Sequence, residues 1–120
     1  MKKQGKLLIV DDEMEIRQIL SEIHEDYAEE IICASNGAEA LDLMYQENFD
    51  CIICDIFMPE LDGISLLQEL SAKKIRLPFV FYTGHADKNI APKLKEYGMY
   101  ELINKPNLAQ LEKIVQRGLV

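Results

Sequence analysis

Apolar and polar residues alternate along this chain in two kinds of block. Short, nearly uninterrupted apolar runs stand at residues 7–10, 51–54 and 79–81, whereas in segments such as 16–23 apolar residues recur every third or fourth position. A continuous run is typical of a strand buried on both faces, and the spaced pattern is typical of a helix with one buried face. The alternation of these blocks predicts five strand–helix repeats.

The boundaries of the ten elements follow from the apolar blocks and the turn-forming residues between them. The five strands are expected at 6–10, 30–34, 51–55, 78–82 and 100–103. The five helices are expected to bury apolar residues within 16–23, 40–44, 64–70, 87–97 and 108–115. Asn36 and Asp62 are suitable N-caps for the second and third helices, with Glu39 as a capping-box-like partner of Asn36. Pro92 fits the fourth helix only in its first turn.

The order of the elements also predicts how they pack. Strands joined through helices pair most easily in parallel, with right-handed crossovers. We therefore predict an α/β fold, a flavodoxin-like doubly wound sheet of five parallel strands with five helices in three layers. The chain has 120 residues, which fits one domain. We expect residues 1–120 to form that single domain, because no linker, repeat or low-complexity segment divides them.

The charge balance narrows the function. Asp and Glu number 21 and Lys and Arg number 13, so the formal net charge is −8. An acidic chain of this kind argues against direct nucleic-acid binding and against electrostatic binding to anionic membranes. The apolar run at 7–10 is too short for a secretory signal, and no run is long enough to span a membrane. We expect a cytoplasmic protein with no membrane insertion.

The three cysteines do not suggest a metal or redox site. Cys51 and Cys54 match a C-x-x-C pattern, but they lie in a predicted strand. Residues three apart on a strand point to opposite faces, so the two thiols cannot converge. We interpret them as buried apolar side chains.

Chemically active residues gather at the predicted strand ends. Asp11 and Asp12 follow the first strand, Asp55 ends the third, Thr83 follows the fourth and Lys105 follows the fifth. In such sheets ligands bind beyond the carboxyl ends of the strands. Two like charges 4 Å apart repel by about 4 kcal/mol at an effective dielectric near 20, so three carboxylates need a cation. Oxygen ligands suit Mg²⁺ or Mn²⁺.

Each of these residues also has an ordinary interpretation. Asp12 is a possible helix N-cap with Glu15 three residues later, and Asp55 is a possible solvated strand end. Thr83 suits any strand, and Lys105 is a possible surface lysine. We favour a shared site because capping does not explain a second acid at position 11, and because four separate segments converge. The acidic first loop also lacks the glycines of a nucleotide phosphate site.

These motifs, taken together and in order, resemble the receiver domain of two-component response regulators over nearly the whole chain. No single motif is specific, but their order and their places on the predicted fold are. The matching segments are 7–13 (LLIVDDE), 34–41 (ASNGAEAL), 55–59 (DIFMP) with 62–63 (DG), 81–84 (FYTG) and 105–106 (KP).

The resemblance implies a role for each residue at the strand ends. Asp55 is the expected phosphoacceptor. Asp11 and Asp12 are expected to hold Mg²⁺ or Mn²⁺, directly or through water, with Asp55 and the backbone carbonyl of Phe57.

Two residues are expected to bind the phosphoryl group itself. Lys105 would pair with its oxygens, and Thr83 would donate a hydrogen bond to it once it is attached. The donor would be a sensor histidine kinase or a histidine phosphotransfer protein. The chain would not be an enzyme toward other substrates, and we expect no output domain within it.

The resemblance departs at Leu102. Many receivers have Tyr or Phe three residues before the lysine, and that ring turns inward with the Thr after phosphorylation. Tyr100 lies on the same strand face but two residues before Leu102. The usual aromatic switch is therefore in question, while phosphorylation is not. Tyr82, Tyr97 and Tyr100 are candidates for an apolar surface around the fourth helix, fifth strand and fifth helix, which a second copy or a downstream protein would contact; core packing is the alternative.

Two histidines and one phenylalanine also need an interpretation. His24 stands among Glu and Asp residues on the first helix, and we interpret it as solvated rather than as a ligand. By the resemblance, His85 and Phe57, each two residues past a site residue, are expected to tune the lifetime of the acyl phosphate.

Three alternatives remain open at this point. The Leu102 departure favours a phosphorylation-independent interaction module on the same fold. By resemblance, a phosphatase with an aspartyl intermediate would need a second Asp two residues after Asp55, but that position holds Phe57. A flavodoxin-like electron carrier fits the fold but lacks a phosphate-receiving loop after the first strand.

Overall fold

The computed structural model describes residues 2–84 and 87–120. In this part of the chain the strands are β1 (Lys6–Val10), β2 (Glu30–Ala34), β3 (Cys51–Cys54), β4 (Phe79–Thr83) and β5 (Met99–Asn104). The helices are α1 (Met14–His24), α2 (Gly37–Gln46), α3 (Gly63–Ala72), α4 (Ala91–Glu96) and α5 (Leu108–Leu119), with a 3₁₀ turn at Lys88–Ile90. The predicted order of five strands and five helices is confirmed.

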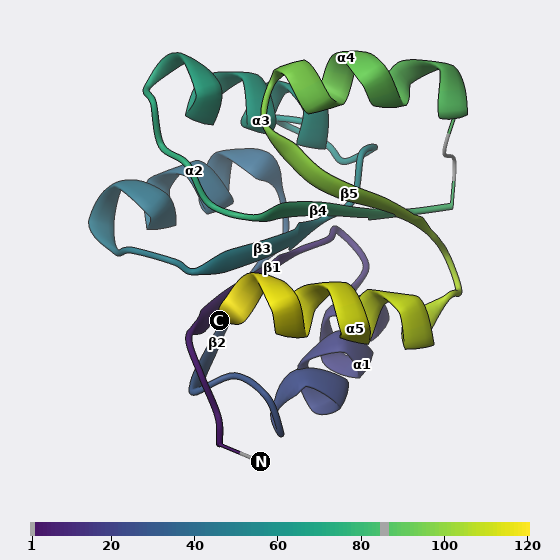
Figure 1. The fold of residues 1–120 in the computed structure, drawn as a ribbon. Helices are drawn as coiled ribbons and strands as arrows, with labels where there is room; N and C mark the ends of the chain where they lie inside the picture. Colours follow the sequence, from purple (N-terminus) through teal and green to yellow (C-terminus); the bar gives the residue numbers. More distant parts are fainter. Residues whose placement is uncertain (1, 85–86) are drawn as a thin grey trace.

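The strands form one parallel sheet in the order β2-β1-β3-β4-β5. Helices α1 and α5 cover one face, and α2, α3 and α4 cover the other (Figure 1). This is the predicted three-layer, doubly wound arrangement. The chain reverses its direction of winding between β1 and β3, because β2 lies outside β1 while β3 lies on its other side. Ligand sites in such sheets lie beyond the strand ends at this position.

Each face of the sheet has its own apolar core. Phe79 and Phe81 belong to the core under α2, α3 and α4, whereas Val80 belongs to the core under α1 and α5. Cys54 lies in the first core and Cys51 in the second, so the two thiols are on opposite faces as predicted. Burial raises the pKa of the Cys51 thiol to about 12, which keeps it protonated and unreactive.

The helix starts agree closely with their sequence signals. Asn36 accepts a hydrogen bond from the backbone N–H of Glu39 at 2.8 Å, and Asp62 accepts one from Ser65 at 2.8 Å. The Glu39 side chain instead accepts from the hydroxyl of Ser35, so the capping box is only half formed. Pro92 falls in the first turn of α4, where its missing N–H is tolerated.

The three tyrosines do not form one surface, which corrects that part of the sequence interpretation. Tyr82 is buried in the core under α1 and α5, and Tyr97 packs partly buried against the core on the other face. Tyr100 alone is well exposed, at 41%. Tyr82 and Tyr97 pack into apolar cores on opposite faces of the sheet, so core packing is the correct interpretation for both.

His24 is fully buried, and its interpretation as a solvated residue was wrong. It lies one helical turn after Leu20, on the buried stripe of α1, and its Nδ1 is 2.8 Å from the carbonyl oxygen of Leu20. Its ring meets Tyr27 edge to face, and its Nε2 has no hydrogen-bond partner in the described part of the chain. The acidic neighbours in sequence misled the interpretation because they occupy the exposed side of the helix.

We expect this buried imidazole to make stability depend on pH. Burial lowers the pKa of His24 below its ordinary value of 6.5, so the unfolded chain takes up a proton that the folded chain does not. The stabilising effect of the neutral ring is complete above pH 6.5 and is lost as the pH falls below it. Between pH 7.5 and 5.5 the wild type should lose more unfolding free energy than His24→Gln, by at most about 1.4 kcal/mol, which is the limit for one histidine with an ordinary pKa in the unfolded chain. Urea denaturation at each pH measures this; equal losses in the two proteins would contradict it.

Candidate functional site

Three carboxylates from two neighbouring strands meet at the carboxyl edge of the sheet. One oxygen each from Asp11, Asp12 and Asp55 lie within 4.8 Å of one another. Asp11 and Asp55 are buried and Asp12 is exposed. They meet because Val10 pairs in register with Cys54, so the residues that follow the two strands leave the sheet side by side.

Asp11 is held at both its backbone and its side chain. Its N–H donates to the carbonyl of Ala34 at 3.2 Å, and its Oδ1 accepts from the backbone N–H of Glu13 at 2.9 Å. Glu13 occupies the N-cap position of α1 without a capping side-chain bond. The alternative role of Asp12 as N-cap is therefore wrong.

Asp55 is fixed in a similar way at the end of β3. Its backbone N–H donates to the carbonyl of Val10 at 3.0 Å, and its Oδ1 accepts from the N–H of Ile56 at 2.7 Å. The start of α3 presses against the same residue: a Cβ on Gly63 would stand 2.1 Å from the backbone oxygen of Asp55. Only glycine allows this approach, which explains why position 63 lacks a side chain.

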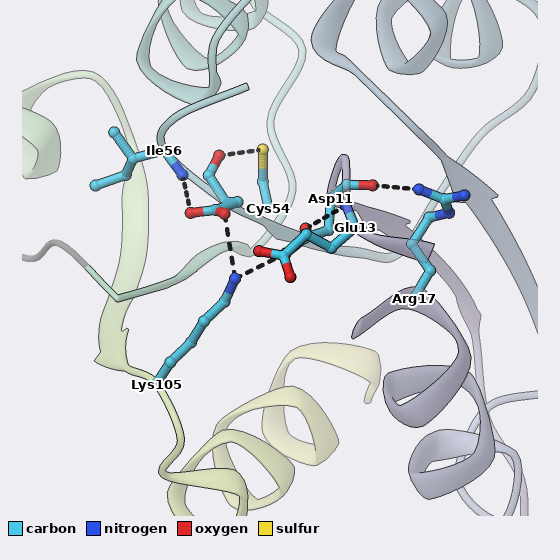
Figure 2. Close-up of polar contacts among 7 residues, drawn as sticks. Asp11, Glu13, Arg17, Cys54, Ile56 and Lys105 are labelled. Carbon is cyan, nitrogen blue, oxygen red and sulfur yellow. Dashed lines mark hydrogen bonds and ion pairs between the residues drawn. The ribbon is translucent and has the colours of Figure 1, made fainter. Parts of the chain in front are cut away.

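Lys105 reaches the carboxylates from the residue that follows β5. Its Nζ donates to Oδ2 of Asp11 at 2.9 Å and to Oδ2 of Asp55 at 3.1 Å. Its own N–H donates to the carbonyl of Thr83 at 2.9 Å, which ties the end of β5 to the end of β4. Figure 2 shows Lys105 and Arg17 approaching Asp11 from different elements.

The electrostatics of the cluster are unbalanced. Burial is the main cause that raises the pKa of Asp11 above its usual range. Burial alone would lower the pKa of Lys105, but its hydrogen bonds and charge interactions with Asp11 and Asp55 together outweigh that effect and raise it. Among the described residues, one ammonium group, that of Lys105, pairs with two of the three clustered carboxylates, Asp11 and Asp55. The site therefore retains an excess of negative charge that favours a further cation.

The site opens into a cleft of about 230 Å³ that is lined by Asp12, Glu13, Asp55, Phe57, Gly84 and Lys105. Phe57 is 59% exposed at its edge. Thr83, by contrast, is fully buried at the end of β4 and is not among the described residues that line the cleft. Its hydroxyl would have to come forward to meet a group bound there.

The residues present fit a small, hard cation. All three side chains of the cluster offer oxygen, and Mg²⁺ in proteins is typically held by one or two carboxylates together with waters and a phosphate. The exposed carboxylate of Asp12 faces solvent, from which the remaining ligands would come. The same donors suit Mn²⁺.

The structure thus gathers the sequence-predicted residues, with two additions. Asp11, Asp12, Asp55 and Lys105 converge directly, and Thr83 lies behind them. Sequence reasoning missed the cleft-lining role of Glu13, and it missed Arg17, whose Nη1 donates to the backbone carbonyl of Asp11 at 2.7 Å. The signal for Arg17 was its place one helical turn after the acidic loop.

Two further sequence expectations concern neighbours of the site. Leu102 is partly buried and packs against the core under α2, α3 and α4, so an aliphatic side chain fills the place of the usual aromatic residue. Tyr82 lies beneath Lys105, with its ring centroid 5.7 Å from Nζ. His85, the other proposed lifetime residue besides Phe57, lies outside the described residues.

A search of the described helices finds none with the length and apolar character needed to cross a membrane.

Comparisons with known proteins agree on one family. The sequence model of the response regulator receiver domain matches residues 7–116. The chain is 37% identical over 116 residues to the regulatory protein AtoC of Escherichia coli, covering 96% of this chain and 25% of that protein. It is 37% identical over 102 residues to the transcriptional regulatory protein SrrA of Staphylococcus aureus, covering 85% of this chain and 42% of that protein. The chain thus spans a quarter to less than half of these relatives.

Solved structures give the same result. The response regulator protein TrrA from Thermotoga maritima, solved in complex with Mg²⁺-BeF, is 32% identical with a TM-score of 0.82, covering 98% of this chain and all of that one. A receiver domain protein from Clostridium thermocellum is 29% identical with a TM-score of 0.85, covering 96% of this chain and 94% of that one.

Proposed function

The chain belongs to the family of response regulator receiver domains, and we propose that it takes a phosphoryl group onto Asp55 from a phosphohistidine of a partner protein. The partner is a sensor histidine kinase or a histidine phosphotransfer protein, and the reaction requires Mg²⁺ or Mn²⁺. The single observation that carries the proposal is the convergence of three carboxylates and one lysine, from three strand ends, on one open cleft.

The proposed chemistry is a substitution at phosphorus. A carboxylate oxygen of Asp55 attacks, an O–P bond forms, and the P–N bond to the donor imidazole breaks. The imidazole leaves with the electron pair and takes a proton. Lys105 donates hydrogen bonds to the transferring oxygens, for which it must exchange part of its present contact with Asp11 and Asp55.

The metal would be held by Asp11 and Asp12, directly or through water, by Asp55, and by the backbone carbonyl of Phe57. When bound, it neutralises charge on the transferring phosphoryl group. The Mg²⁺-BeF complex of the Thermotoga relative supports this assignment, because it is a protein 32% identical over nearly the full chain.

The signal would follow from a new contact. An attached phosphoryl group brings about −1.5 to −2 charge and three acceptor oxygens. Thr83 is buried behind the cleft before the reaction, so a bond to the phosphoryl group would move the β4 end and favour a second conformation. We propose that a second copy or a downstream protein reads this change over α4, β5 and α5.

In this proposal the chain acts only on itself and is not an enzyme toward other substrates. It would work in the cytoplasm, where histidine kinases present their phosphohistidine. One observation favours a second candidate function, an interaction module that does not need phosphorylation: Leu102 fills the place of the aromatic switch residue. Unequal partner affinity between wild type and Asp55→Asn in the presence of phosphodonor would exclude that candidate.

The test is incubation with a small-molecule phosphodonor such as acetyl phosphate, followed by intact-mass measurement. We expect a gain of one phosphoryl group with Mg²⁺ and none with EDTA. Asp55→Asn should abolish the gain completely, whereas Asp50→Asn, an exposed acid at the other end of β3, should leave it unchanged. Absence of any gain in the wild type, or a gain that survives Asp55→Asn, would refute the proposal.

A further inference from the structure

Asp12 is the least anchored of the three clustered acids. Asp11 and Asp55 each bond to Lys105 and to a backbone N–H. In the described part of the chain, Asp12 makes no side-chain hydrogen bond or ion pair, and it is exposed. Its carboxylate nevertheless stands within 4.8 Å of the other two. Its position must therefore be set by its backbone.

The backbone before Asp12 is held by Arg17. The carbonyl of Asp11 belongs to the peptide unit that joins Asp11 to Asp12, and the Nη1 of Arg17 donates to that oxygen at 2.7 Å. This is a short, charge-assisted hydrogen bond. Because the peptide unit is planar and extends to the Cα of Asp12, holding its oxygen restrains the backbone position from which the Asp12 side chain leaves.

The backbone of Arg17 is held in α1 by hydrogen bonds. Its N–H donates to the carbonyl of Glu13 at 3.1 Å, and its carbonyl accepts from the hydroxyl of Ser21 at 2.8 Å. The residue is half-buried on α1, and Figure 2 shows its side chain extending from that helix to Asp11. The guanidinium group of Arg17 thus links the acidic loop at Asp11 to helix α1.

We propose that Arg17 is a positioning residue for the metal site: it orients the peptide unit before Asp12 so that the Asp12 carboxylate is ready to hold the divalent cation. This inference rests on the proposed function of the cluster. It assigns Arg17 no contact with the metal or the phosphoryl group.

The direction in which Mg²⁺ affinity changes when Arg17 is replaced distinguishes positioning from a simple charge effect. A guanidinium close to an acidic site repels an incoming cation, so removing its charge should strengthen Mg²⁺ binding. Loss of positioning should weaken it, since residues that orient metal ligands typically contribute 10–100-fold to affinity. We expect Arg17→Met to weaken Mg²⁺ binding about tenfold. Arg17→Lys should weaken it less, because an ammonium group can still donate one hydrogen bond to the carbonyl of Asp11.

The experiment is isothermal titration calorimetry with MgCl₂ on the full chain, paired with melting temperatures in EDTA and in saturating Mg²⁺. Arg117→Met is the matched control, because Arg117 lies exposed in the last turn of α5, and its affinity should equal that of wild type. A merely structural Arg17 would lower both melting temperatures equally, whereas a positioning Arg17 reduces the Mg²⁺-dependent increase. If Arg17→Met is poorly folded, Arg17→Lys supplies the same comparison.

A double-mutant cycle tests the route through Asp12. In an Asp12→Asn background, Arg17→Met should cause no further loss of Mg²⁺ affinity. Equal or tighter Mg²⁺ binding by Arg17→Met, or independent losses in the cycle, would overturn the inference. A wild type that binds no Mg²⁺ would instead refute the metal site of the proposed function, so the two failures are distinguishable.

Discussion

Lys105→Gln is expected to lower the unfolding free energy in EDTA by about 2 kcal/mol. The substitution removes the only cation within hydrogen-bond distance of the side-chain carboxylates of Asp11 and Asp55 among the described residues. Breaking a buried ion pair from one side typically costs 3–5 kcal/mol, because the remaining charge stays buried and unpaired. We expect a smaller loss here because the site opens to solvent at the cleft. Urea denaturation in EDTA measures the difference.

The same substitution should have opposite effects on metal binding and on phosphorylation. The Nζ of Lys105 occupies oxygens of Asp11 and Asp55 that would face the cation, so its loss should tighten Mg²⁺ binding. Phosphoryl transfer should slow by about a hundredfold, as is typical when one donor to a developing charge is removed. Phosphorylation time courses by intact mass give the rate.

The matched control is Lys113→Gln, an exposed lysine on α5, which should leave stability, Mg²⁺ affinity and rate unchanged. Unaltered phosphorylation in Lys105→Gln would show that the lysine serves only to balance charge in the metal-free site.

The fold was largely predictable because its strands are buried on both faces. Short apolar runs such as 7–10 and 51–54 are best explained as buried parallel strands. Because such strands end at the same edge of the sheet, the residue that follows each of them lies at that edge. The cluster of Asp11, Asp55 and Lys105 follows from topology and register alone. The sequence supplies the residue types, and the parallel sheet brings them to the same edge.

The parts that could not be predicted depend on three-dimensional packing. His24 stands among acidic residues in sequence, but its helical phase, one turn after the buried Leu20, places it on the buried side of α1. Tyr82 and Tyr97 are both aromatic, yet they face opposite cores. Arg17 acts through a backbone oxygen, and no sequence pattern identifies the acceptor of such a bond. Apolar periodicity shows which side of a helix or strand is buried, but it does not show which other element packs against that side.

Magnesium is expected to stabilise the wild type strongly and Asp11→Asn not at all. A ligand that binds only the native state at 100 times its dissociation constant adds about 2.7 kcal/mol. For a domain of this size that corresponds to a rise in melting temperature of about 10 °C. Asp11→Asn replaces one of the three clustered carboxylates with a neutral amide, which binds Mg²⁺ poorly. Thermal melts across a MgCl₂ titration measure both proteins.

The metal-free behaviour of Asp11→Asn makes this prediction more specific. Burial raises the pKa of Asp11 above its ordinary value of 3.8, so at neutral pH the charged carboxylate reduces the stability of the folded state. Asparagine removes that penalty, while Lys105 keeps its partner Asp55. Stability in EDTA should therefore change by less than about 1 kcal/mol. Asp42→Asn, an exposed acid on α2, should respond to Mg²⁺ like wild type. A wild-type melting temperature that does not move with Mg²⁺ would refute the metal site, and a full Mg²⁺ response in Asp11→Asn would remove Asp11 from it.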